Sequence, residues 1–370
     1  MTTFTAKEYL RYTRHIQLPQ VGAQGQTTLK NAHALIIGCG GLGAPVSLYL
    51  AAAGVGTITV VDGDTVELSN LQRQITFVEN DVGCNKAQRT QQRLQDLNSD
   101  ITVHAITEHL DESNAPALIA VASIVLDCTD SFNARCLINE TCREFNKAWV
   151  YASLYQFSGQ CAVFTPTGPC FNCLFSAPAN NAPNCNVAGV LGALPGLMGT
   201  IQANEALKYL LGLDGLLESK LLLIETSTMD FQTLVIHSDP GCSSCGNGAS
   251  NTKKASDHSL QKINAVSPFG KQLSCDEMIA LAQSNQAQLI DVRSQQEHVA
   301  FNLGGLNIPL ALIESGDFSF KRDKPIMLYC QAGPRSEHAC ALLIAQGFDA
   351  GYLEGGLAKT LATSHAKIKS

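Results

Sequence analysis

The residues of this chain with the most evident chemistry are two C-x-x-C pairs, Cys170 with Cys173 and Cys242 with Cys245. Either pair alone could be redox-active or inert. Together they offer four thiolates, which fill a tetrahedral zinc site and leave no position open for a substrate. Because 68 residues lie between Cys173 and Cys242, such a site would join distant parts of the chain. We therefore predict a structural Zn²⁺ site at these four cysteines.

A further cysteine, Cys330, follows the apolar run 326–329 and begins the loop CQAGPR, which ends at Arg335. A loop between a strand and a helix can direct backbone N–H groups at the cysteine sulfur, and Arg335 adds positive charge. Both features favour a thiolate and, after sulfur uptake, a persulfide anion. Four residues lie between Cys330 and Arg335, one fewer than in cysteine phosphatases, so the loop favours a single sulfur over a phosphate.

A G-x-G-x-x-G pattern spans Gly38 to Gly43, between an expected strand and an expected helix. Glycines there allow phosphate groups to approach backbone N–H groups at the helix N-terminus. Asp62 ends the next strand, nineteen residues after Gly43, where a carboxylate can accept hydrogen bonds from a ribose. Taken alone, this pattern favours a dinucleotide-dependent oxidoreductase, with a glycine-rich turn that binds nothing as the alternative.

The next residues fit a triphosphate better than a nicotinamide dinucleotide. The polar stretch SNLQRQ contains Asn70 and Arg73, and Lys86 opens the following helix. Arg73 and Lys86 could neutralise a triphosphate that Asn70 orients, although solvated surface positions are the alternative for both cations. Asp130 follows a strand end, where open α/β sheets place ligands, and its carboxylate can hold Mg²⁺.

Cys185 lies in the loop NNAPNCNVAG, just before an apolar segment that begins at Gly189. A cysteine immediately before a helix N-terminus can have a lowered thiol pKa and act as a nucleophile. A catalytic thiol and an accessible bystander thiol both remain open for this position.

Alternating strands and helices must position these residues. Apolar strands are expected at 34–37, 57–61, 101–106 and 124–127, with helices at 41–53 and 86–97. This alternation predicts a Rossmann-like, mostly parallel α/β sheet. Closely spaced strands at 149–154, 160–165, 221–226 and 234–237 predict an antiparallel extension. A second, smaller α/β pattern follows a polar stretch, so we predict a domain at 1–246, a linker at 247–262 and a domain at 263–370.

The composition agrees with two globular domains. The chain has 370 residues, of which 45% are apolar, and its net charge is −7. That length exceeds what one hydrophobic core usually supports, and the negative charge argues against nucleic acid as a partner. No signal peptide or membrane span is apparent. Fourteen cysteines without a secretory signal favour a reducing, cytoplasmic location over a disulfide framework.

Several motifs together resemble one enzyme family. The segments RYTRHIQLP, GCGGLGAP, VDGDTVELSNLQRQ and LDCTD, with Lys86, keep the order and spacing found in the MoeB/ThiF family of adenylyltransferases. That family is related to the ubiquitin-activating enzymes and acts on small ubiquitin-like sulfur carrier proteins of the MoaD/ThiS kind, which end in Gly-Gly. The resemblance implies that ATP, with Mg²⁺, adenylates the carrier's C-terminal glycine. Molybdenum cofactor biosynthesis is one pathway in which such enzymes act.

The resemblance also implies roles for individual residues. It places the nucleotide and its metal at Gly41, Asp62, Ser69, Asn70, Arg73, Lys86, Asp130 and Ser131. Arg14 matches an arginine that family dimers donate to the neighbouring subunit's site, which implies a homodimer. The four paired cysteines match the family's zinc ligands. Cys185 matches a loop cysteine that some members bond covalently to the carrier.

The C-terminal segment resembles a rhodanese sulfurtransferase domain over about 266–361. The resemblance rests on the Cys330 loop and on the segments LIDVR, NIP and LEGG. The stretch from Asn302 to Gly305 lacks the histidine commonly seen there, and no tryptophan follows Gly356. These departures concern packing and partner contacts more than the persulfide loop.

We expect a two-domain enzyme. The first domain makes the carrier acyl-adenylate, and Cys330, assisted by Arg335, passes on sulfur from a persulfide donor such as a cysteine desulfurase to give a thiocarboxylate. The alternative is an adenylating enzyme whose rhodanese-like domain only docks a partner. A nicotinamide oxidoreductase is rejected if NAD(H) fails to bind while ATP binds.

Overall fold

The computed structural model describes residues 4–175, 189–246, 271–284, 286–320 and 324–360. The chain forms two compact units, Met1–Lys254 and Ala255–Ser370. The linker predicted at 247–262 lies outside the described residues. No helix in the described ranges is both long enough and apolar enough to cross a membrane.

The first unit is built on an eight-stranded sheet with the order β3-β2-β1-β4-β5-β6-β7-β8. The first five strands in this order run parallel and the last three pair antiparallel. The mostly parallel sheet with an antiparallel extension is therefore confirmed. The strands are β1 His33–Ile37, β2 Thr57–Val61, β3 Thr102–Ile106, β4 Ile124–Asp127, β5 Trp149–Tyr155, β6 Ser158–Phe164, β7 Lys220–Glu225 and β8 Asp230–Val235.

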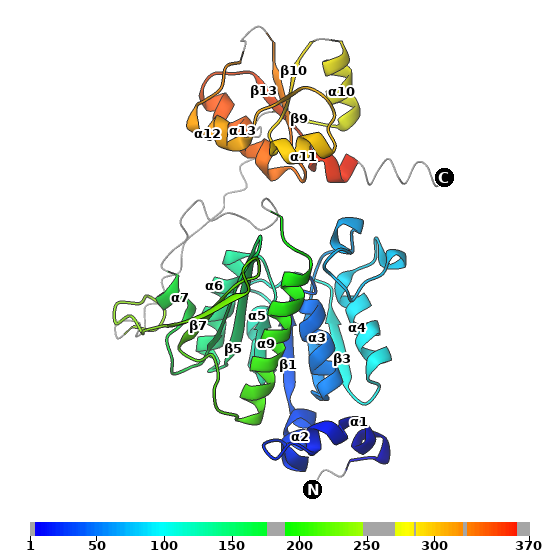
Figure 1. Ribbon diagram of the computed structural model, residues 1–370, viewed down its shortest axis with the longest axis vertical. Helices are drawn as coiled ribbons and strands as arrows, with labels where there is room; N and C mark the ends of the chain where they lie inside the picture. The colour runs from blue at the N-terminus through cyan, green and yellow to red at the C-terminus, as the bar shows by residue number, and fades with distance from the viewer. Residues whose placement is uncertain (1–3, 176–188, 247–270, 285, 321–323, 361–370) are drawn as a thin grey trace. The chain divides into compact units, whose positions relative to one another are not determined.

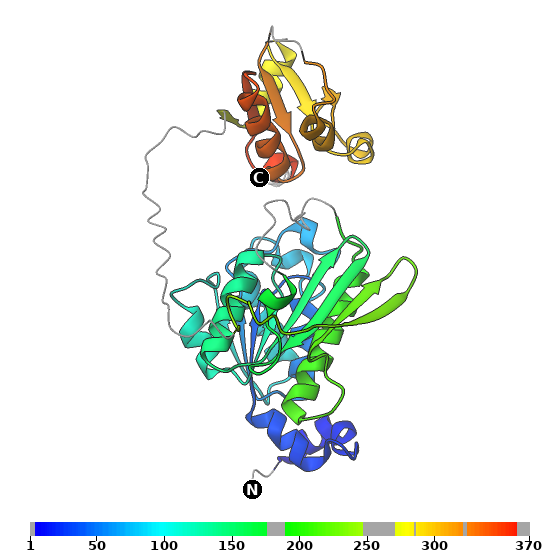
Figure 2. The same cartoon turned by 90° about the vertical axis from the view of Figure 1, so that its left-hand side faces the viewer.

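Helices cover both faces of this sheet (Figures 1 and 2). Successive residues of β1 alternate between two apolar cores: Ala34 and Ile36 pack with α3, α4 and α9, whereas Leu35 and Ile37 pack with α5 and α6. A strand buried on both faces explains the continuous apolar runs in the sequence. The helices are α1 Ala6–Ile16, α2 Gly22–Asn31, α3 Gly43–Ala53, α4 Lys86–Leu97, α5 Ala115–Val121, α6 Phe132–Glu144, α7 Phe171–Leu174 and α9 Ala193–Leu211, with short 3₁₀ turns η1 Leu68–Asn70 and η2 Glu79–Asp81.

Several expected boundaries differ from the structure by one to four residues, and two of the differences have a local cause. Helix α3 begins at Gly43 rather than Gly41, because the residues before it form the glycine loop. Strand β8 begins at Asp230, earlier than the expected 234, because a tight turn with Met229 in the left-handed region (φ 59°) pairs Glu225 with Asp230. Turn geometry of this kind leaves little trace in hydrophobic periodicity.

The second unit contains a five-stranded, all-parallel sheet with the order β11-β10-β12-β13-β9. Two apolar clusters, one around Leu328 and one around Tyr329, lie on opposite faces of the central strand β12. This is the smaller α/β domain expected from the sequence. Its elements are β9 Lys271–Leu273, α10 Cys275–Gln283, β10 Gln288–Asp291, α11 Gln295–Ala300, β11 Leu306–Asn307, α12 Leu310–Ser315, β12 Ile326–Tyr329, α13 Pro334–Ala345 and β13 Ala350–Leu353.

Candidate nucleotide, metal and persulfide sites

The glycine loop joins the end of β1 to the start of α3. Gly38 has a φ of 95°, and a Cβ atom at Gly43 would lie 2.1 Å from the Gly38 carbonyl oxygen. A side chain at Gly43 would therefore break the close turn from strand to helix. The Cys39 N–H donates to Asp62 Oδ2 over 2.7 Å, so the loop is tied to the end of β2.

Asp62 is buried at this junction, and its second carboxylate oxygen accepts from the Asp64 N–H over 2.9 Å. Burial raises the pKa of Asp62, while the Cys39 N–H and the Lys86 cation oppose that rise. The carboxylate thus orders the loop in addition to the ribose contact expected from the sequence.

The polar stretch after β2 lies against the same loop. The Arg73 guanidinium donates to the Ser69 carbonyl over 3.1 Å, and the Arg73 Cγ atom lies 3.6 Å from the position that a Cβ atom of Gly41 would occupy. Asn70 is buried, and its Oδ1 atom accepts from the Glu67 N–H over 3.3 Å. Arg73 is therefore next to the glycine turn, as a phosphate ligand would need to be.

Lys86 is the first residue of α4 and only 8% exposed. Its Nζ atom lies 3.0 Å from Asp64 Oδ2, and its backbone N–H donates to the Asp64 carbonyl over 2.9 Å. The preceding residue, Asn85, donates to the carbonyl of Asp62 over 3.1 Å. Lys86 therefore begins α4 next to the residue that is bound to the glycine loop, and Asp64 balances its charge. Asp64 was not singled out from the sequence, although it lies two residues beyond Asp62.

The loop after β4 touches the glycine loop. A Cβ atom at Gly38 would lie 2.6 Å from the Cys128 carbonyl oxygen, and exposed Asp130 and Ser131 follow two and three residues later. The Ser131 hydroxyl accepts from the Ala134 N–H and caps α6. Because β1 has β2 on one side and β4 on the other, the two loops meet where strand order reverses, the usual ligand site of open α/β sheets.

A buried ion pair between Arg135 and Asp127 holds the loop after β4 in place. The Arg135 Nε atom donates to Asp127 Oδ2 over 3.0 Å, and its Nη2 atom donates to the Thr129 carbonyl over 2.8 Å. Asp127 also accepts from both the N–H and the hydroxyl of Thr129. These bonds hold the loop that presents Asp130. Asp127 lies in the LDCTD segment, but sequence reasoning did not pair it with Arg135, which lies eight residues further along the chain on α6.

Gln74 is another residue near the glycine loop that sequence reasoning did not assign to the site. It is 5% exposed, and its Nε2 atom lies 3.6 Å from the position of a Cβ atom on Gly40. Within the described residues, its Oε1 atom has no hydrogen-bond partner. An unpaired buried amide oxygen is rare in folded proteins. Gln74 is therefore recognisable as a candidate site residue from the structure, but not from the sequence.

Arg14, a predicted site residue, is not part of this cluster. Arg14 is exposed on α1, and α1 packs against the far end of α4, where the Asn98 Nδ2 atom donates to the Tyr12 hydroxyl over 2.8 Å. Lys86 begins α4 at the opposite end, about 18 Å away for a helix of this length. Within one chain, Arg14 therefore lies near the opposite end of the sheet strands from the glycine loop. Cys185 lies outside the described residues.

The four paired cysteines converge, although they come from distant segments. Their sulfur atoms all lie within 4.8 Å of one another. The Sγ–Sγ distances are 3.5 Å between Cys170 and Cys242, 3.2 Å between Cys173 and Cys245, and 3.9 Å between Cys170 and Cys173. A tetrahedral metal with Zn–S bonds of about 2.3 Å requires sulfur separations of about 3.8 Å. The cluster could therefore bind a metal ion.

The first cysteine pair is held by α7 and an aromatic core. Phe171, between the two cysteines, is buried against Trp149, Tyr151 and Phe164, and its N–H donates to Asn139 Oδ1 over 3.1 Å. The cluster therefore joins α6, α7 and the segment after β8 at one point.

Cys330 lies in the predicted loop between β12 and α13, and only 1% of the residue is exposed. The Gly333 N–H donates to Cys330 Sγ over 3.1 Å, and the Ser336 hydroxyl lies 3.4 Å from the same sulfur. Gly333 has a φ of 106°, which favours glycine. The loop thus directs a backbone N–H and a hydroxyl at the sulfur, next to the N-terminus of α13.

Arg335, on the first turn of α13, is bound by a carboxylate. Its Nη1 and Nη2 atoms donate to the two carboxylate oxygens of Glu297 over 2.8 and 2.7 Å. Burial opposes ionisation of Glu297, but the Arg335 and Ser294 hydrogen bonds lower its pKa to about 2. The Arg335 charge expected at the sulfur is therefore partly balanced. Glu297 lies 38 residues from Arg335, and no local spacing links them.

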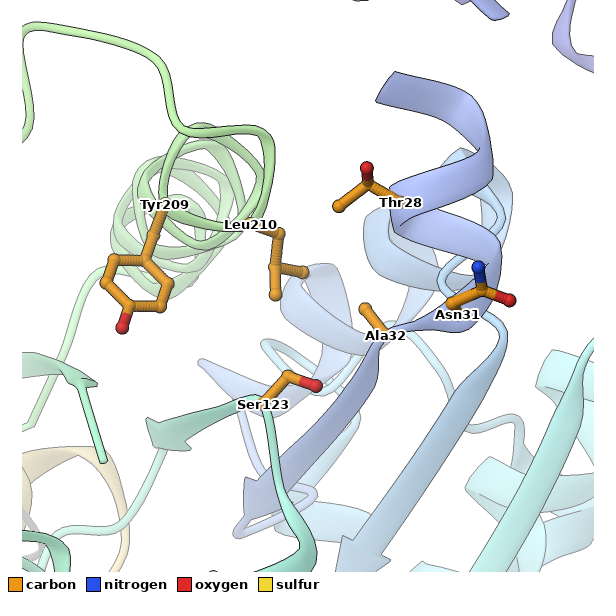
Figure 3. A pocket seen from close by; sticks show the side chains of 6 residues that line it. All are labelled: Thr28, Asn31, Ala32, Ser123, Tyr209 and Leu210. Carbon is orange, nitrogen blue, oxygen red and sulfur yellow. The ribbon is translucent and has the colours of Figure 1, made fainter. Parts of the chain in front are cut away.

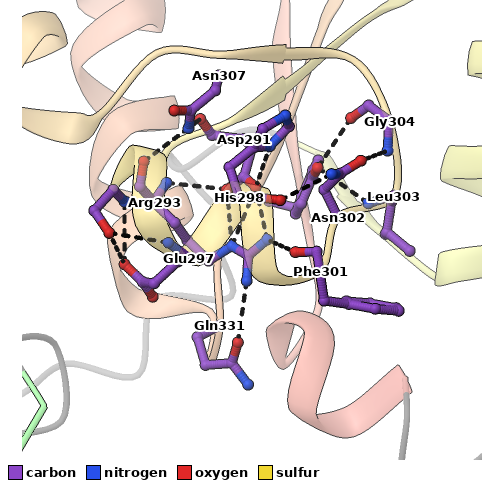
Figure 4. Close-up of polar contacts among 12 residues, drawn as sticks. Asp291, Arg293, Glu297, His298, Phe301, Asn302, Leu303, Gly304, Asn307 and Gln331 are labelled. Carbon is purple, nitrogen blue, oxygen red and sulfur yellow. Dashed lines mark hydrogen bonds and ion pairs between the residues drawn. The ribbon is translucent and has the colours of Figure 1, made fainter.

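A second buried network lies beside the loop (Figure 4). The Arg293 guanidinium donates to both carboxylate oxygens of Asp291, and its Nη1 atom lies 3.4 Å from Gln331 Oε1. The His298 Nδ1 atom lies 2.9 Å from Asp291 Oδ2. Asp291 and Arg293 thus connect the end of β10 to the residue that follows Cys330.

A separate pocket lies at the opposite, amino-terminal edge of the large sheet (Figure 3). It is bordered by the residues just before β1 and β4 and by the end of α9. None of the predicted site residues is among those that line it, which are Thr28, Asn31, Ala32, Ser123, Tyr209 and Leu210.

Two domains define the class of this protein. The first is doubly wound and contains a four-cysteine cluster, and the second is a small parallel α/β domain with a cysteine loop. Residues 12–244 match the ThiF family and residues 274–363 match the rhodanese-like domain. The chain belongs to the ThiF family and has a C-terminal rhodanese-like domain.

Individual relatives agree with both parts. The chain is 43% identical over 251 residues to the sulfur carrier protein adenylyltransferase of Thermus thermophilus, covering 66% of this chain and 93% of that protein. It is 34% identical over 380 residues to the probable adenylyltransferase/sulfurtransferase MoeZ of Mycobacterium tuberculosis, covering 96% and 93%. The structure of Escherichia coli MccB with ATP aligns with a TM-score of 0.56 and 27% identity, covering 65% of this chain and 75% of MccB.

Proposed function

We propose that the N-terminal domain uses ATP to adenylate the C-terminal glycine of a small ubiquitin-like sulfur carrier protein. The main support is the convergence of the loops after β1, β2 and β4, which brings Arg73 beside the glycine turn and places the start of α4, with Lys86, next to Asp62. A relative with the name sulfur carrier protein adenylyltransferase matches 66% of this chain. The concentration of cations exceeds what a nicotinamide dinucleotide requires.

In this proposal the chain acts mainly by positioning and charge neutralisation. The nucleotide lies against Gly41 and Asp62, with Ser69, Asn70 and Ser131 as polar ligands at its edge. Arg73 and Lys86 neutralise the phosphates, and Asp130 offers carboxylate oxygens to Mg²⁺. The carrier carboxylate attacks the α-phosphorus, the bond to the bridging oxygen of the β-phosphate breaks, and pyrophosphate leaves.

We further propose that Cys330 delivers sulfur to the acyl-adenylate. A persulfide donor such as a cysteine desulfurase loads the thiol, and the terminal persulfide sulfur attacks the carrier carbonyl while AMP leaves. A second thiol then attacks the Cys330 sulfur, forming a disulfide and releasing the thiocarboxylate. The Gly333 N–H and the Ser336 hydroxyl contact the sulfur that undergoes these steps. Cys185 is one candidate for the second thiol.

A homodimer would reconcile Arg14 with its implied role. In its own chain Arg14 lies at the sheet edge opposite the glycine loop, so it reaches a nucleotide only in a neighbouring subunit. Exposed Tyr9, Leu10 and Leu18 flank it on and after α1, as an interface would require.

Zn²⁺ is the metal proposed for the four-cysteine cluster. The four thiolate donors and their near-tetrahedral separations suit zinc, and four protein ligands leave no open position for a reactant. Its contribution is stability, because it fixes α7 to the segment after β8. All thirteen cysteines among the described residues are free thiols, which suits a reducing, cytoplasmic compartment.

Cys173→Ser should lower zinc content and stability together, because a metal bound only by the folded state contributes folding free energy. We expect less than half the wild-type zinc by elemental analysis and a Tm lower by about 5–10 °C. Cys275→Ser, outside the cluster, is the control and should change neither. A zinc-free wild-type protein, or a Cys173→Ser variant as stable as wild type, would contradict the assignment.

The combined activity can be tested with a purified ubiquitin-like carrier that ends in Gly-Gly. The full chain, ATP, Mg²⁺, a dithiol and a cysteine desulfurase with cysteine should convert the carrier to a thiocarboxylate, detected as an oxygen-to-sulfur mass gain. Leaving out ATP should abolish it. Absence of carrier-dependent ATP–pyrophosphate exchange, or binding of NAD(H) instead of ATP, would overturn the proposal.

A further inference from the structure

The environment of Arg335 suggests a role for a residue outside the Cys330 loop. The expectation from the sequence is that the Arg335 cation acts directly on the sulfur. In the structure its two terminal nitrogens instead face the carboxylate of Glu297, forming a two-pronged pair. Such parallel hydrogen bonds fix the plane of a guanidinium as well as its position.

Glu297 is itself anchored independently of Arg335. It is the third residue of α11, whose capping box ties it to Ser294: its Oε2 atom accepts from the Ser294 N–H and hydroxyl, each over 3.0 Å. The carboxylate therefore does not have to move with the guanidinium. Its pKa of about 2 keeps the carboxylate ionised at neutral pH.

Arg335 belongs to the loop around the sulfur: the next residue, Ser336, has its hydroxyl 3.4 Å from Cys330 Sγ. Its side chain is 10% exposed. Burial lowers the pKa of Arg335, but the charges of Glu297, Cys330 and Asp291 outweigh that effect and raise it. Without Glu297, Arg335 would be a largely buried cation that has lost its carboxylate partner, in the same loop as the Cys330 thiol.

The other charged groups near the loop are already balanced. Asp291 and Arg293 form a buried pair, with His298 against the same carboxylate. Burial raises the pKa of Tyr329 to about 12, so its phenol stays neutral. Among the described residues, Arg335 and Glu297 are therefore the charged pair whose balance sets the net charge next to Cys330.

We propose that Glu297 is a positioning residue for sulfur transfer, which holds the Arg335 guanidinium and limits the positive charge felt by the Cys330 sulfur. The positive charge at the sulfur is then large enough to favour the thiolate or persulfide. It is not so large that the anion loses nucleophilicity. A thiolate with a lower pKa is a weaker nucleophile, with a Brønsted coefficient of about 0.4–0.5. This proposal rests on Cys330 being the reactive thiol of the proposed function.

The test is the pH dependence of Cys330 alkylation by iodoacetamide in the full chain, followed by mass spectrometry of the Cys330 peptide. Glu297→Gln keeps the size of the side chain and removes its charge, so the alkylation midpoint should fall by about one pH unit. Thiosulfate–cyanide sulfurtransferase turnover above that midpoint should fall about 3-fold. Glu314→Gln removes the same charge from an exposed pair with His338 in the same domain and should leave both values unchanged.

A double-variant comparison separates positioning from a general structural effect. In an Arg335→Gln background, Glu297→Gln should no longer shift the midpoint, because the charge it controls is absent. An equal shift in both backgrounds, or no shift beyond that of Glu314→Gln, would overturn the proposal while leaving Cys330 as the sulfur acceptor. A wild-type Cys330 that neither alkylates nor takes up sulfur would instead refute the proposed function.

Discussion

Replacing Cys330 with serine should eliminate sulfur transfer while leaving adenylation intact. The nucleotide loops belong to the first domain, and no step of acyl-adenylate formation uses a thiol of the second. Serine fits the loop but cannot hold a persulfide. We expect thiosulfate–cyanide sulfurtransferase activity and carrier thiocarboxylate formation to fall below about 1% of wild type. Carrier-dependent ATP–pyrophosphate exchange should remain at the wild-type rate.

Cys340→Ser is the matched control, because Cys340 is a buried cysteine of the same domain that lies on α13, ten residues after Cys330 and outside the loop. It should retain both activities. A normal oxygen-to-sulfur mass gain produced by Cys330→Ser would show that another route delivers sulfur. The docking-module alternative, in which this domain only binds a partner, would then be favoured.

Arg73→Ala and Lys86→Ala should each reduce carrier-dependent ATP–pyrophosphate exchange by at least about 100-fold. Each change removes a cation beside the glycine turn, and loss of one preorganised charge or donor at a developing anion has effects of this size. Neither should affect thiosulfate–cyanide activity, which depends on the second domain. Exchange of labelled pyrophosphate into ATP measures the loss, and an unchanged thermal unfolding midpoint verifies that the first domain is folded.

Arg93→Ala provides the control for charge alone. Arg93 is an exposed cation on α4, the helix that Lys86 begins, and it donates to the Thr76 carbonyl. Its removal should change exchange less than about 2-fold, as expected for a surface substitution. Wild-type exchange in Arg73→Ala or Lys86→Ala would refute the assignment of the nucleotide site.

Much of the architecture could be predicted because the signals are local. The apolar runs of β1, β2 and β4 and the spacing of glycines from Gly38 to Gly43 arise from backbone rules that act within a few residues. The family resemblance and the two-part α/β organisation follow from the same segments, and both are confirmed. The roles of individual residues, including Arg73, Lys86 and Asp130, stay predictions, since only chemistry can test them.

By itself, the sequence determined which residue types are available and in which order: a glycine loop, a cationic stretch, two cysteine pairs and a cysteine loop. Only the tertiary structure decided which of them meet. It brought Cys170 within 3.5 Å of Cys242, bound Arg335 to Glu297, and kept Arg14 at the edge of the sheet away from the glycine loop. These contacts join segments tens of residues apart, and their partners are set by how strands order and helices pack, which no local spacing records.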